Sequence, residues 1–313
     1  MRFGSYHFTG IFQETAELPP YKGSTFRGSF GQALRKTMCV TRQKECVGCL
    51  LARQCLYATT FENPRQPSLG TDRPRSSPPL PYVIEPDSTP RTQFRQHEKF
   101  EFDLLLFGKS NDYLPYFVFA VEQMGNQGIG RRKQEARGRF RLQEVKAREG
   151  VVYRQENGQL LPGPHDTPLV LTLPEHASSG ALTLRLITPL RLKHANHYQA
   201  ELPFHLLVRA MLRRISTLFE TFGEGEPVLD YRGIIRQAET VAVTSEDLHW
   251  HDWTRYSNRQ EQKMLLGGML GQITYHGKIG TYLPLLEIAR QVHIGKQTSF
   301  GLGQIDYAWR PGA

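Results

Sequence analysis

The residues best suited to chemistry lie near the end of the chain, in a loop that combines three glycines with a histidine and a lysine. The stretch from Val292 to Gln304 reads VHIGKQTSFGLGQ. Glycine lets backbone amides approach a phosphate closely, because it has no side chain to block the approach. The loop is therefore predicted to bind a phosphate group. Its candidate contacts are Gly295, Lys296, Gly301 and Gly303.

Two common nucleotide-binding loops do not fit this stretch. A P-loop needs a glycine five residues before Gly295 and a Ser or Thr directly after the lysine. The chain has Arg290 and Gln297 at these positions. A dinucleotide-binding loop follows a strand and opens a helix, whereas this loop follows an expected helix and precedes an expected strand. The phosphate must belong to another kind of ligand.

The positive charge of the chain is concentrated in one segment. The 313 residues carry 39 Lys and Arg against 30 Asp and Glu, a net charge of +9. Eight basic and two acidic residues lie between Arg131 and Arg148, so this segment supplies +6 of the total. Such concentration indicates a polyanionic partner, and a solvated charged face is the simpler alternative. The candidate phosphate contacts in the segment are Arg131, Arg132, Lys133, Arg137 and Arg139.

All four cysteines of the chain fall in one short window, with the spacing C-x6-C-x2-C-x5-C. The central pair can present two thiolates to one metal ion, and the outer two can complete a tetrahedral site. We therefore expect a structural zinc ion, and no catalytic one because the window has no histidine. The alternatives are an iron–sulfur cluster, disulfides, which a cytosolic protein disfavours, and plain cysteines. The expected ligands are Cys39, Cys46, Cys49 and Cys55.

The elements that position these residues follow the same order in both halves of the chain. In the first half we expect strands and helices at residues 2–12, 26–38, 99–107, 111–124 and 139–145, with a glycine-rich loop at Gly125–Gly130. In the second half we expect them at residues 181–192, 204–222, 239–248, 270–276, 281–291 and 304–309. The order resembles βαββαβ, so the predicted fold class is α+β with two tandem ferredoxin-like, RRM-like domains. RNA-binding domains of this topology use the face of the sheet.

The domains are predicted at residues 1–165 and 181–313, separated by a turn-rich junction at Pro162–Gly180. The first domain carries the cysteine segment, residues 39–55, as an insertion. It also carries a segment with eight prolines, residues 64–90, which is predicted as an extended surface excursion. The chain has no apolar signal segment and no apolar run of membrane-spanning length, so the cytoplasm is the expected location and no membrane partner is expected.

Several of these segments resemble a known family. Leu18–Gly31 (LPPYKGSTFRGSFG), followed by the four cysteines, is similar to the start of CRISPR-associated RAMP-superfamily endoribonucleases that process precursor crRNA. Trp253–Gln260 (WTRYSNRQ), the pair Gly267-Gly268 and the terminal glycine loop are similar to the C-terminal domain of that family. The matching segments cover most of the chain apart from the proline-rich segment. The resemblance implies two ferredoxin-like domains and cleavage of CRISPR repeat RNA.

The resemblance also implies a reaction without a catalytic metal, because the RNA supplies the nucleophile. A ribose 2′-OH attacks the adjacent phosphorus and leaves a 2′,3′-cyclic phosphate and a 5′-OH. The protein must align the backbone, accept and donate a proton, and stabilise the added negative charge. DNA lacks the 2′-OH and is not expected to be cut.

The family often uses a histidine from the opening helix of the first domain, and this chain departs from that pattern. It has no histidine between His7 and His97. His293 is therefore the first catalytic candidate, since its ordinary pKa suits proton transfer, and a packed loop histidine is the alternative. Further catalytic candidates flank the first helix or follow the first strand of the second half: Tyr21, Lys22, Arg27, His194 and His197.

RNA contacts are also expected in the WTRYSNRQ segment. Arg255, Tyr256 and Arg259 can stack on bases or contact phosphates, although Trp250, Trp253 and Tyr256 can equally pack in the core. The expected partners are thus CRISPR repeat RNA, crRNA and other subunits of a CRISPR effector complex. Two functions compete with the nuclease: a non-catalytic crRNA-binding RAMP subunit of an effector complex, and a zinc-dependent DNA-binding protein.

Overall fold

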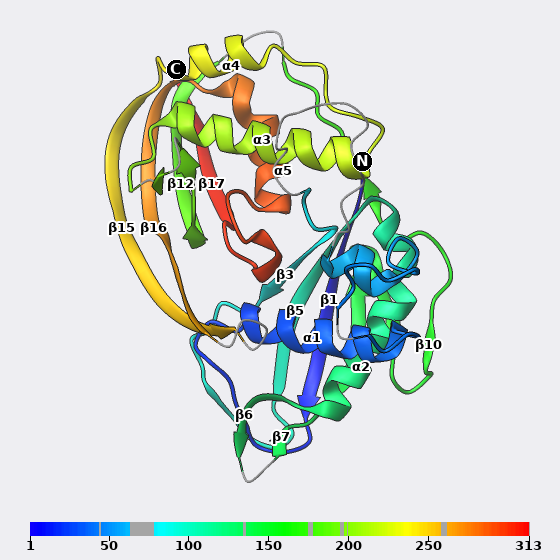
Figure 1. Cartoon of the computed structure of the whole chain (residues 1–313). Helices are drawn as coiled ribbons and strands as arrows, with labels where there is room; N and C mark the ends of the chain where they lie inside the picture. Colours follow the sequence, from blue (N-terminus) through cyan, green and yellow to red (C-terminus); the bar gives the residue numbers. More distant parts are fainter. Residues whose placement is uncertain are drawn as a thin grey trace. The chain divides into compact units, whose positions relative to one another are not determined.

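The computed structural model in Figure 1 describes residues 1–312, apart from residues 44, 63–77, 134–135, 175–177, 195–196, 199 and 258–261. At residues 133, 136, 194, 197, 254–257 and 262–266 only the backbone is described. The chain divides into two compact units: Arg2–Pro168, the first unit, and Leu169–Ala313, the second unit, which also includes Met1. The division falls inside the turn-rich stretch Pro162–Gly180.

The first unit contains an antiparallel sheet with two helices. Along the sheet the strands are ordered β10-β9-β8-β1-β5-β3. Their bounds are β1 (Arg2–Phe12), β3 (Tyr82–Pro86), β5 (Lys99–Phe107), β8 (Phe140–Ala147), β9 (Gly150–Arg154) and β10 (Gln159–Leu160). The helices are α1 (Gly23–Met38) and α2 (Leu114–Gln127). The order β1-α1-β3-β5-α2-β8 is the predicted βαββαβ order.

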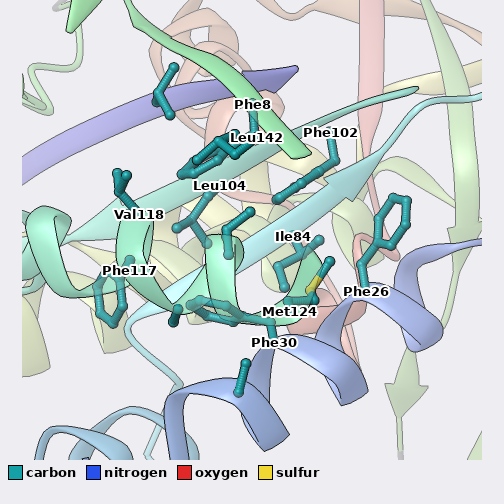
Figure 2. Packing of buried hydrophobic residues seen from close by; sticks show 14 of the residues in the cluster. Phe8, Phe26, Phe30, Ile84, Phe102, Leu104, Phe117, Val118, Met124 and Leu142 are labelled. Atoms are coloured by element: carbon teal, nitrogen blue, oxygen red, sulfur yellow. The ribbon is translucent and has the colours of Figure 1, made fainter. Parts of the chain in front are cut away.

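Alternation along the strands directs one face of this sheet to the helices. Successive residues of a strand point to opposite faces, and in β1 the buried rings of Tyr6, Phe8 and Phe12 share one face. Figure 2 shows rings and aliphatic side chains from both layers meeting in the core. The strands contribute Phe8, Ile84, Phe102, Leu104 and Leu142, and the helices contribute Phe26, Phe30, Phe117, Val118 and Met124. Burying each of these side chains stabilises the fold by about 1.5–3 kcal/mol.

Strand β3 corrects the prediction of a surface excursion at residues 64–90. Tyr82, Val83 and Ile84 are buried, and the strand pairs with β5 from Tyr82↔Leu106 to Pro86↔Phe102. It is the last strand of the sheet, and proline is tolerated in such an edge strand. The neighbouring prolines therefore obscured a core strand in the sequence. Residues 63–77 lie outside the described residues, so the first part of the prediction is not tested.

The expected glycine-rich loop at Gly125–Gly130 is also different in the structure. Its first residues are the last turn of α2, and Gly125 packs so closely that an added Cβ would lie 2.3 Å from the carbonyl oxygen of Phe140. Gly128, with a φ of +73°, ends the helix. The glycines of this segment thus let α2 end against β8, and no separate loop is formed.

The second unit repeats the same order of elements. Its sheet runs β15-β16-β12-β17 and is antiparallel, with β12 (Ser179–Leu190), β15 (Ala242–Ser257), β16 (Gln262–Lys278) and β17 (Ile305–Pro311). The helices are α3 (Phe204–Phe222), α4 (Tyr231–Ala238) and α5 (Leu283–Val292). Helix α4 was not predicted, and its first turn is capped by Asp230, whose carboxylate accepts a hydrogen bond from Gly233 N at 3.0 Å.

Strands β15 and β16 are much longer than the predicted strands at residues 239–248 and 270–276. They pair continuously from Ala242↔His276 to Ser257↔Gln262, whereas β12 pairs with β16 only from Lys278 back to Met269. Figure 1 shows the pair as a long curved ribbon in yellow and orange. Glycines at 267, 268 and 271 interrupt the alternation that would mark a strand in the sequence.

Shorter elements connect the main ones. The short strands are β2 (Ala16–Glu17), β4 (Gln93–Phe94), β6 (Ile129–Lys133), β7 (Ala136–Gly138), β11 (Thr167–Pro168), β13 (Lys193–His194) and β14 (His197–Tyr198). Single helical turns lie at Ala58–Glu62, Gly108–Tyr113, Gly280–Tyr282 and Thr298–Phe300. None of the helices in the described part of the chain is both long and apolar enough to cross a bilayer.

Candidate nucleic-acid interface

The terminal glycine loop, His293–Gln304, is bound to the end of strand β12. Lys296 N donates to the carbonyl of Arg191 at 2.9 Å, and Gly303 N donates to that of Pro189 at 3.1 Å. The hydroxyl of Thr188 donates to the carbonyl of Gly301 at 2.8 Å. These bonds join residues more than 100 positions apart, so the loop and the end of β12 fix each other.

Two of the loop glycines are required by close backbone approach. Gly295 has a φ of +86°, and an added Cβ would lie 2.6 Å from the carbonyl oxygen of Arg191. Gly303 has a φ of +76°, and an added Cβ would lie 1.8 Å from that of Ile294. Non-glycine residues rarely adopt such backbone angles. Because the amides of Lys296, Gly301 and Gly303 bond to carbonyls of the chain itself, the glycines shape the loop, and their phosphate contacts stay a prediction.

His293 lies inside this loop. Its side chain is fully buried, and its Nδ1 is 3.0 Å from the carbonyl oxygen of Leu302. Arg214 donates to the carbonyls of Val292 and His293 at 3.1–3.2 Å, and burial lowers the pKa of Arg214 to about 9. A general base must reach the proton that it takes from the substrate. His293 is buried in this loop, and both its catalytic role and the alternative of a packed loop histidine stay predictions.

Positive charge gathers around Lys296. Lys296, Arg213 and Lys193 are all exposed. The pKa of Lys296 is lowered by burial first, and then by the positive charges of Arg213 and Lys193. Three cations from α3, β13 and the glycine loop, here called the basic cluster, thus lie close enough to affect one another. Such a cluster attracts a polyanion.

Arg191, which the sequence analysis missed, links the loop to an aromatic pair. Its Nη1 donates to Gln297 Oε1 at 2.9 Å, and its guanidinium lies 4.7 Å from the centre of the Tyr198 ring. The Tyr198 ring in turn lies 6.4 Å from that of Trp250. Trp250 is 38% exposed, so its side chain is not part of the core. No local pattern in the sequence marks Arg191, because its partners are brought by the tertiary fold.

In the first unit, the basic segment is partly neutralised. Arg131 pairs with Glu17 at 3.3 Å, and Arg139 forms two hydrogen bonds with the carboxylate of Glu14. Among the residues whose side chains are described, Arg132 and Arg141 are exposed and form no ion pair. Arg141 lines a hollow of about 640 Å³ at the end of β1. Arg137 is half-buried, and the side chain of Lys133 is not described.

The candidates at the start of α1 are largely covered. Lys22 is buried, donates to the carbonyl of Thr89 at 2.5 Å and has a pKa lowered by that burial. Burial raises the pKa of Tyr21. The guanidinium of Arg27 lies 5.4 Å from the centre of the Phe61 ring. Tyr21 thus keeps its proton at neutral pH, and Arg27 supplies a fixed positive charge.

A half-exposed histidine with a carboxylate partner was also missed. His7 on β1 has its Nδ1 3.0 Å from Asp103 Oδ1 and its Nε2 3.7 Å from Glu101 Oε1. A carboxylate bonded to one ring nitrogen orients the other for proton transfer. Burial raises the pKa of Asp103, and the nearby His7 opposes that shift. The pairing of β1 with β5 across 96 residues creates this contact, so the sequence alone does not reveal it.

The four cysteines line one hollow of about 360 Å³. They form no disulfide, and the Thr41 hydroxyl lies 3.8 Å from Cys39 Sγ and 3.7 Å from Cys49 Sγ. The donor set, four thiols on one hollow, suits zinc. In the described part of the chain, however, no three His, Cys, Asp or Glu side chains are arranged as they would be around a metal ion. The zinc ion therefore stays a prediction.

The remaining candidates are placed by their backbones or not at all. Arg255 lies in β15 opposite Met264, and His194 pairs with His197 between β13 and β14. The side chains of these residues are not described, and Arg259 lies outside the described residues.

Comparison with known proteins assigns both halves of the chain. The AF_1859_N family of N-terminal domains matches residues 1–165, which is more than half of the chain. The family of the CRISPR-associated endoribonuclease Cas6 matches residues 184–305, a range that covers most of the second unit and the glycine loop. An uncharacterized protein of Archaeoglobus fulgidus is 26% identical over 289 residues, which cover 91% of each chain.

Solved structures show the same fold. A product complex of the Cas6 protein TTHB231 is similar with a TM-score of 0.57 and 15% identity, over 98% of this chain and 99% of that one. Thermus thermophilus Cas6 (TTHB231) is similar with a TM-score of 0.54 and 14% identity, over 98% of both chains. A partial Cas6-RT-Cas1–Cas2 complex gives a TM-score of 0.55 and 14% identity, over 99% of this chain and 46% of that one.

The two βαββαβ units give this chain the fold of these Cas6 structures. The chain belongs to the family that the AF_1859_N domain describes, and residues 184–305 match the Cas6 endoribonuclease family.

Proposed function

We propose that this chain is an endoribonuclease that cleaves CRISPR repeat RNA within precursor crRNA. The observation that carries the proposal is a second unit of the Cas6 family whose glycine loop holds Lys296 beside Arg213 and Lys193. A cluster of cations suits the phosphates of an RNA strand, and the resulting affinity for RNA is expected to weaken as the salt concentration rises. The similarity to a Cas6 product complex supports the same substrate class.

The proposed reaction is transesterification without a catalytic metal, in which the 2′-OH attacks the adjacent phosphorus. Arg27 would stabilise the negative charge that develops on the phosphate, because a guanidinium can donate two hydrogen bonds to phosphate oxygens. Tyr21 would donate a hydrogen bond, since burial raises its pKa and keeps the phenol protonated. Neither His7 nor His293 is proposed as the base, because His7 points to the face of the sheet opposite the helices and His293 is buried in the glycine loop.

The test is incubation of the purified chain with CRISPR repeat RNA in EDTA. Products with a 5′-OH and a 2′,3′-cyclic phosphate are expected. A matched RNA with a single 2′-deoxyribose at the cleavage position should bind equally and stay intact, because the nucleophile is missing. Cleavage of the deoxy-substituted strand, or dependence on added Mg²⁺, would contradict the mechanism.

The residue roles are tested by single-turnover cleavage at saturating protein. Arg27→Met, which removes the charge, is expected to lower the rate by about 10²–10³-fold, the loss typical of one group that stabilises transition-state charge. Tyr21→Phe should slow cleavage, and Tyr116→Phe, which changes an exposed ring of α2, should not. Equal rates for the wild type and Arg27→Met would exclude this role of Arg27.

A non-catalytic crRNA-binding subunit of a CRISPR effector complex is the second proposal. It is favoured by the absence of histidine from α1 and by the burial of His293. Tight binding of repeat RNA without any product in the assay above would establish it. In either case we propose other CRISPR proteins as partners, which the likeness to part of a Cas6-RT-Cas1–Cas2 complex supports.

A further inference from the structure

Arg191 is a buried cation whose hydrogen bonding is incomplete. Its side chain is only 7% exposed. A guanidinium has five N–H donors, and Nη1 uses one of them on Gln297. Its Nε has no acceptor, and no carboxylate pairs with it among the described residues. A buried charge without a counter-ion is unfavourable, so this position is suited to an anionic ligand.

The backbone of Arg191 is joined to the loop that carries Lys296. The carbonyl of Arg191 accepts a hydrogen bond from Lys296 N at 2.9 Å, so the two residues are held together by the loop. Lys193 follows two positions later and is exposed. Arg213 and Lys193 both act on the charge of Lys296. The backbone thus connects Arg191 both to the glycine loop and to β13, which carry two members of the basic cluster.

Beside this cationic position lie two exposed aromatic rings. The guanidinium of Arg191 lies 4.7 Å from the centre of the Tyr198 ring, which is 50% exposed. Trp250 follows at 6.4 Å from Tyr198, with the ring planes inclined by 53°. Both rings are partly exposed, whereas most aromatic side chains of the described chain are buried.

The tryptophan is held in place by the pair Gly267-Gly268 on β16. Trp250 Nε1 donates to Asp252 Oδ1 at 2.9 Å. An added Cβ at Gly267 would lie 2.6 Å from Trp250 Nε1, so the indole lies directly over this glycine. An added Cβ at Gly268 would lie 3.1 Å from Arg191 Cγ. Gly267 thus makes room for the indole of Trp250, and Gly268 makes room for the side chain of Arg191.

We propose that Arg191, Tyr198 and Trp250 form a subsite for one unpaired nucleotide of an RNA strand. The phosphate binds to the guanidinium of Arg191 and the basic cluster, and the base stacks on Tyr198 and Trp250. Single-stranded RNA is commonly bound by a cationic groove combined with aromatic stacking. The inference rests on the proposed function, since it assigns a subsite to the same RNA ligand.

The proposed stacking of a base on Tyr198 and Trp250 is tested by binding of oligo(U) and of an abasic ribose-phosphate strand of equal length. Tyr198→Ala and Trp250→Ala are each expected to weaken oligo(U) binding by about 5-fold or more, the loss typical of one stacked base. Binding of the abasic strand should not change, because no base is present. Tyr198→Phe retains the ring and should bind oligo(U) like the wild type.

The proposed phosphate contact of Arg191 is tested by the salt dependence of RNA binding. Arg191→Met is expected to reduce the slope of log affinity against log salt by about 0.7, the value for one phosphate contact on a single strand. Arg232→Met, at an exposed arginine of α4, is the matched control and should leave the slope unchanged. Lys193→Met, at an exposed residue of the cluster, should reduce the slope as well, and serves if Arg191→Met proves unstable.

Cleavage of repeat RNA is measured on the same preparations, so that the two proposals can fail separately. Equal losses of oligo(U) and abasic binding in Tyr198→Ala, or no loss in either, would overturn the subsite even where the wild type cuts RNA. A wild type that binds neither strand would overturn it as well. A wild type that shows the expected binding pattern but never cuts repeat RNA would overturn the nuclease and keep the subsite.

Discussion

Gly303→Ala should destabilise the second unit strongly. Gly303 has a φ of +76°, and an added Cβ would lie 1.8 Å from the carbonyl oxygen of Ile294. That carbonyl belongs to the backbone, so it cannot rotate away as a flexible side chain would. Relief of the clash must move the two arms of the glycine loop apart.

The size of the effect follows from these contacts. A left-handed backbone conformation costs an alanine about 1–2 kcal/mol relative to glycine. Moving the arms also weakens the hydrogen bond from Ile294 N to Gly303 O, at 3.0 Å, and that from Gly303 N to Pro189 O, at 3.1 Å. Each such bond contributes about 1 kcal/mol net. The total is about 2–4 kcal/mol, or roughly 5–15 °C in the melting temperature of a unit of this size.

Tryptophan fluorescence is the assay, because all three tryptophans lie in the second unit. Trp250, Trp253 and Trp309 fall within Leu169–Ala313. Their signal reports the unfolding of that unit alone, and far-UV circular dichroism reports both units. The control is Gly28→Ala in α1, where an added Cβ would have no atom within 4 Å. Alanine is the better helix former, so this change should stabilise the first unit by about 0.5–1 kcal/mol.

A Gly303→Ala protein with the wild-type melting midpoint would refute the reasoning. It would mean that the loop rearranges without cost, and that close approach does not explain the glycine. A fall in the midpoint of Gly28→Ala of the same size would refute it equally, since the two glycines would then be indistinguishable.

Three further predictions concern the metal, the basic cluster and the loop histidine. Elemental analysis of the purified chain should find about one zinc ion per chain, and Cys49→Ser should lose it. Chelation should lower stability but leave RNA cleavage in place, and a zinc-free native protein would contradict the site. RNA affinity should fall as the pH rises through the lowered pKa of Lys296, because the ammonium then loses its charge. Lys296→Arg, which keeps its charge, should remove that dependence in anisotropy titrations. His293→Ala should lower the melting temperature, since the buried ring loses its contact with Leu302. It should leave the pH profile of single-turnover cleavage unchanged, and a shifted profile would restore His293 as a catalytic residue.

Elements with an uninterrupted apolar period were predictable to the residue. The predicted ranges 2–12, 99–107 and 204–222 coincide with β1, β5 and α3. Each of these elements buries one face, so its apolar residues recur in the sequence with the period of a strand or a helix. Prolines beside β3 and glycines within β16 lower the local preference for a strand, so the sequence did not reveal β3 or the full length of β15 and β16. These strands are stabilised by pairing with their neighbours in the sheet.

Some residues of the candidate site could be recognised in the sequence, and others could not. The glycine loop and Lys296 stand out in the sequence, because three glycines lie within a few residues of a lysine and a histidine. The basic segment was found too, yet Glu14 and Glu17 neutralise part of it from far along the chain. Arg191 and Tyr198 were missed, because nothing near them in the sequence marks either as a ligand contact.

The βαββαβ order and the glycine loop could thus be predicted from local patterns, although β3 and α4 could not. The role of the loop glycines became clear only from the contacts of the fold. Hydrogen bonds across more than 100 residues join the loop to the end of β12, and this contact buries His293 and positions Arg191. Periodicity and composition are local properties of a chain, whereas burial and the partners of a charge depend on which distant segments meet.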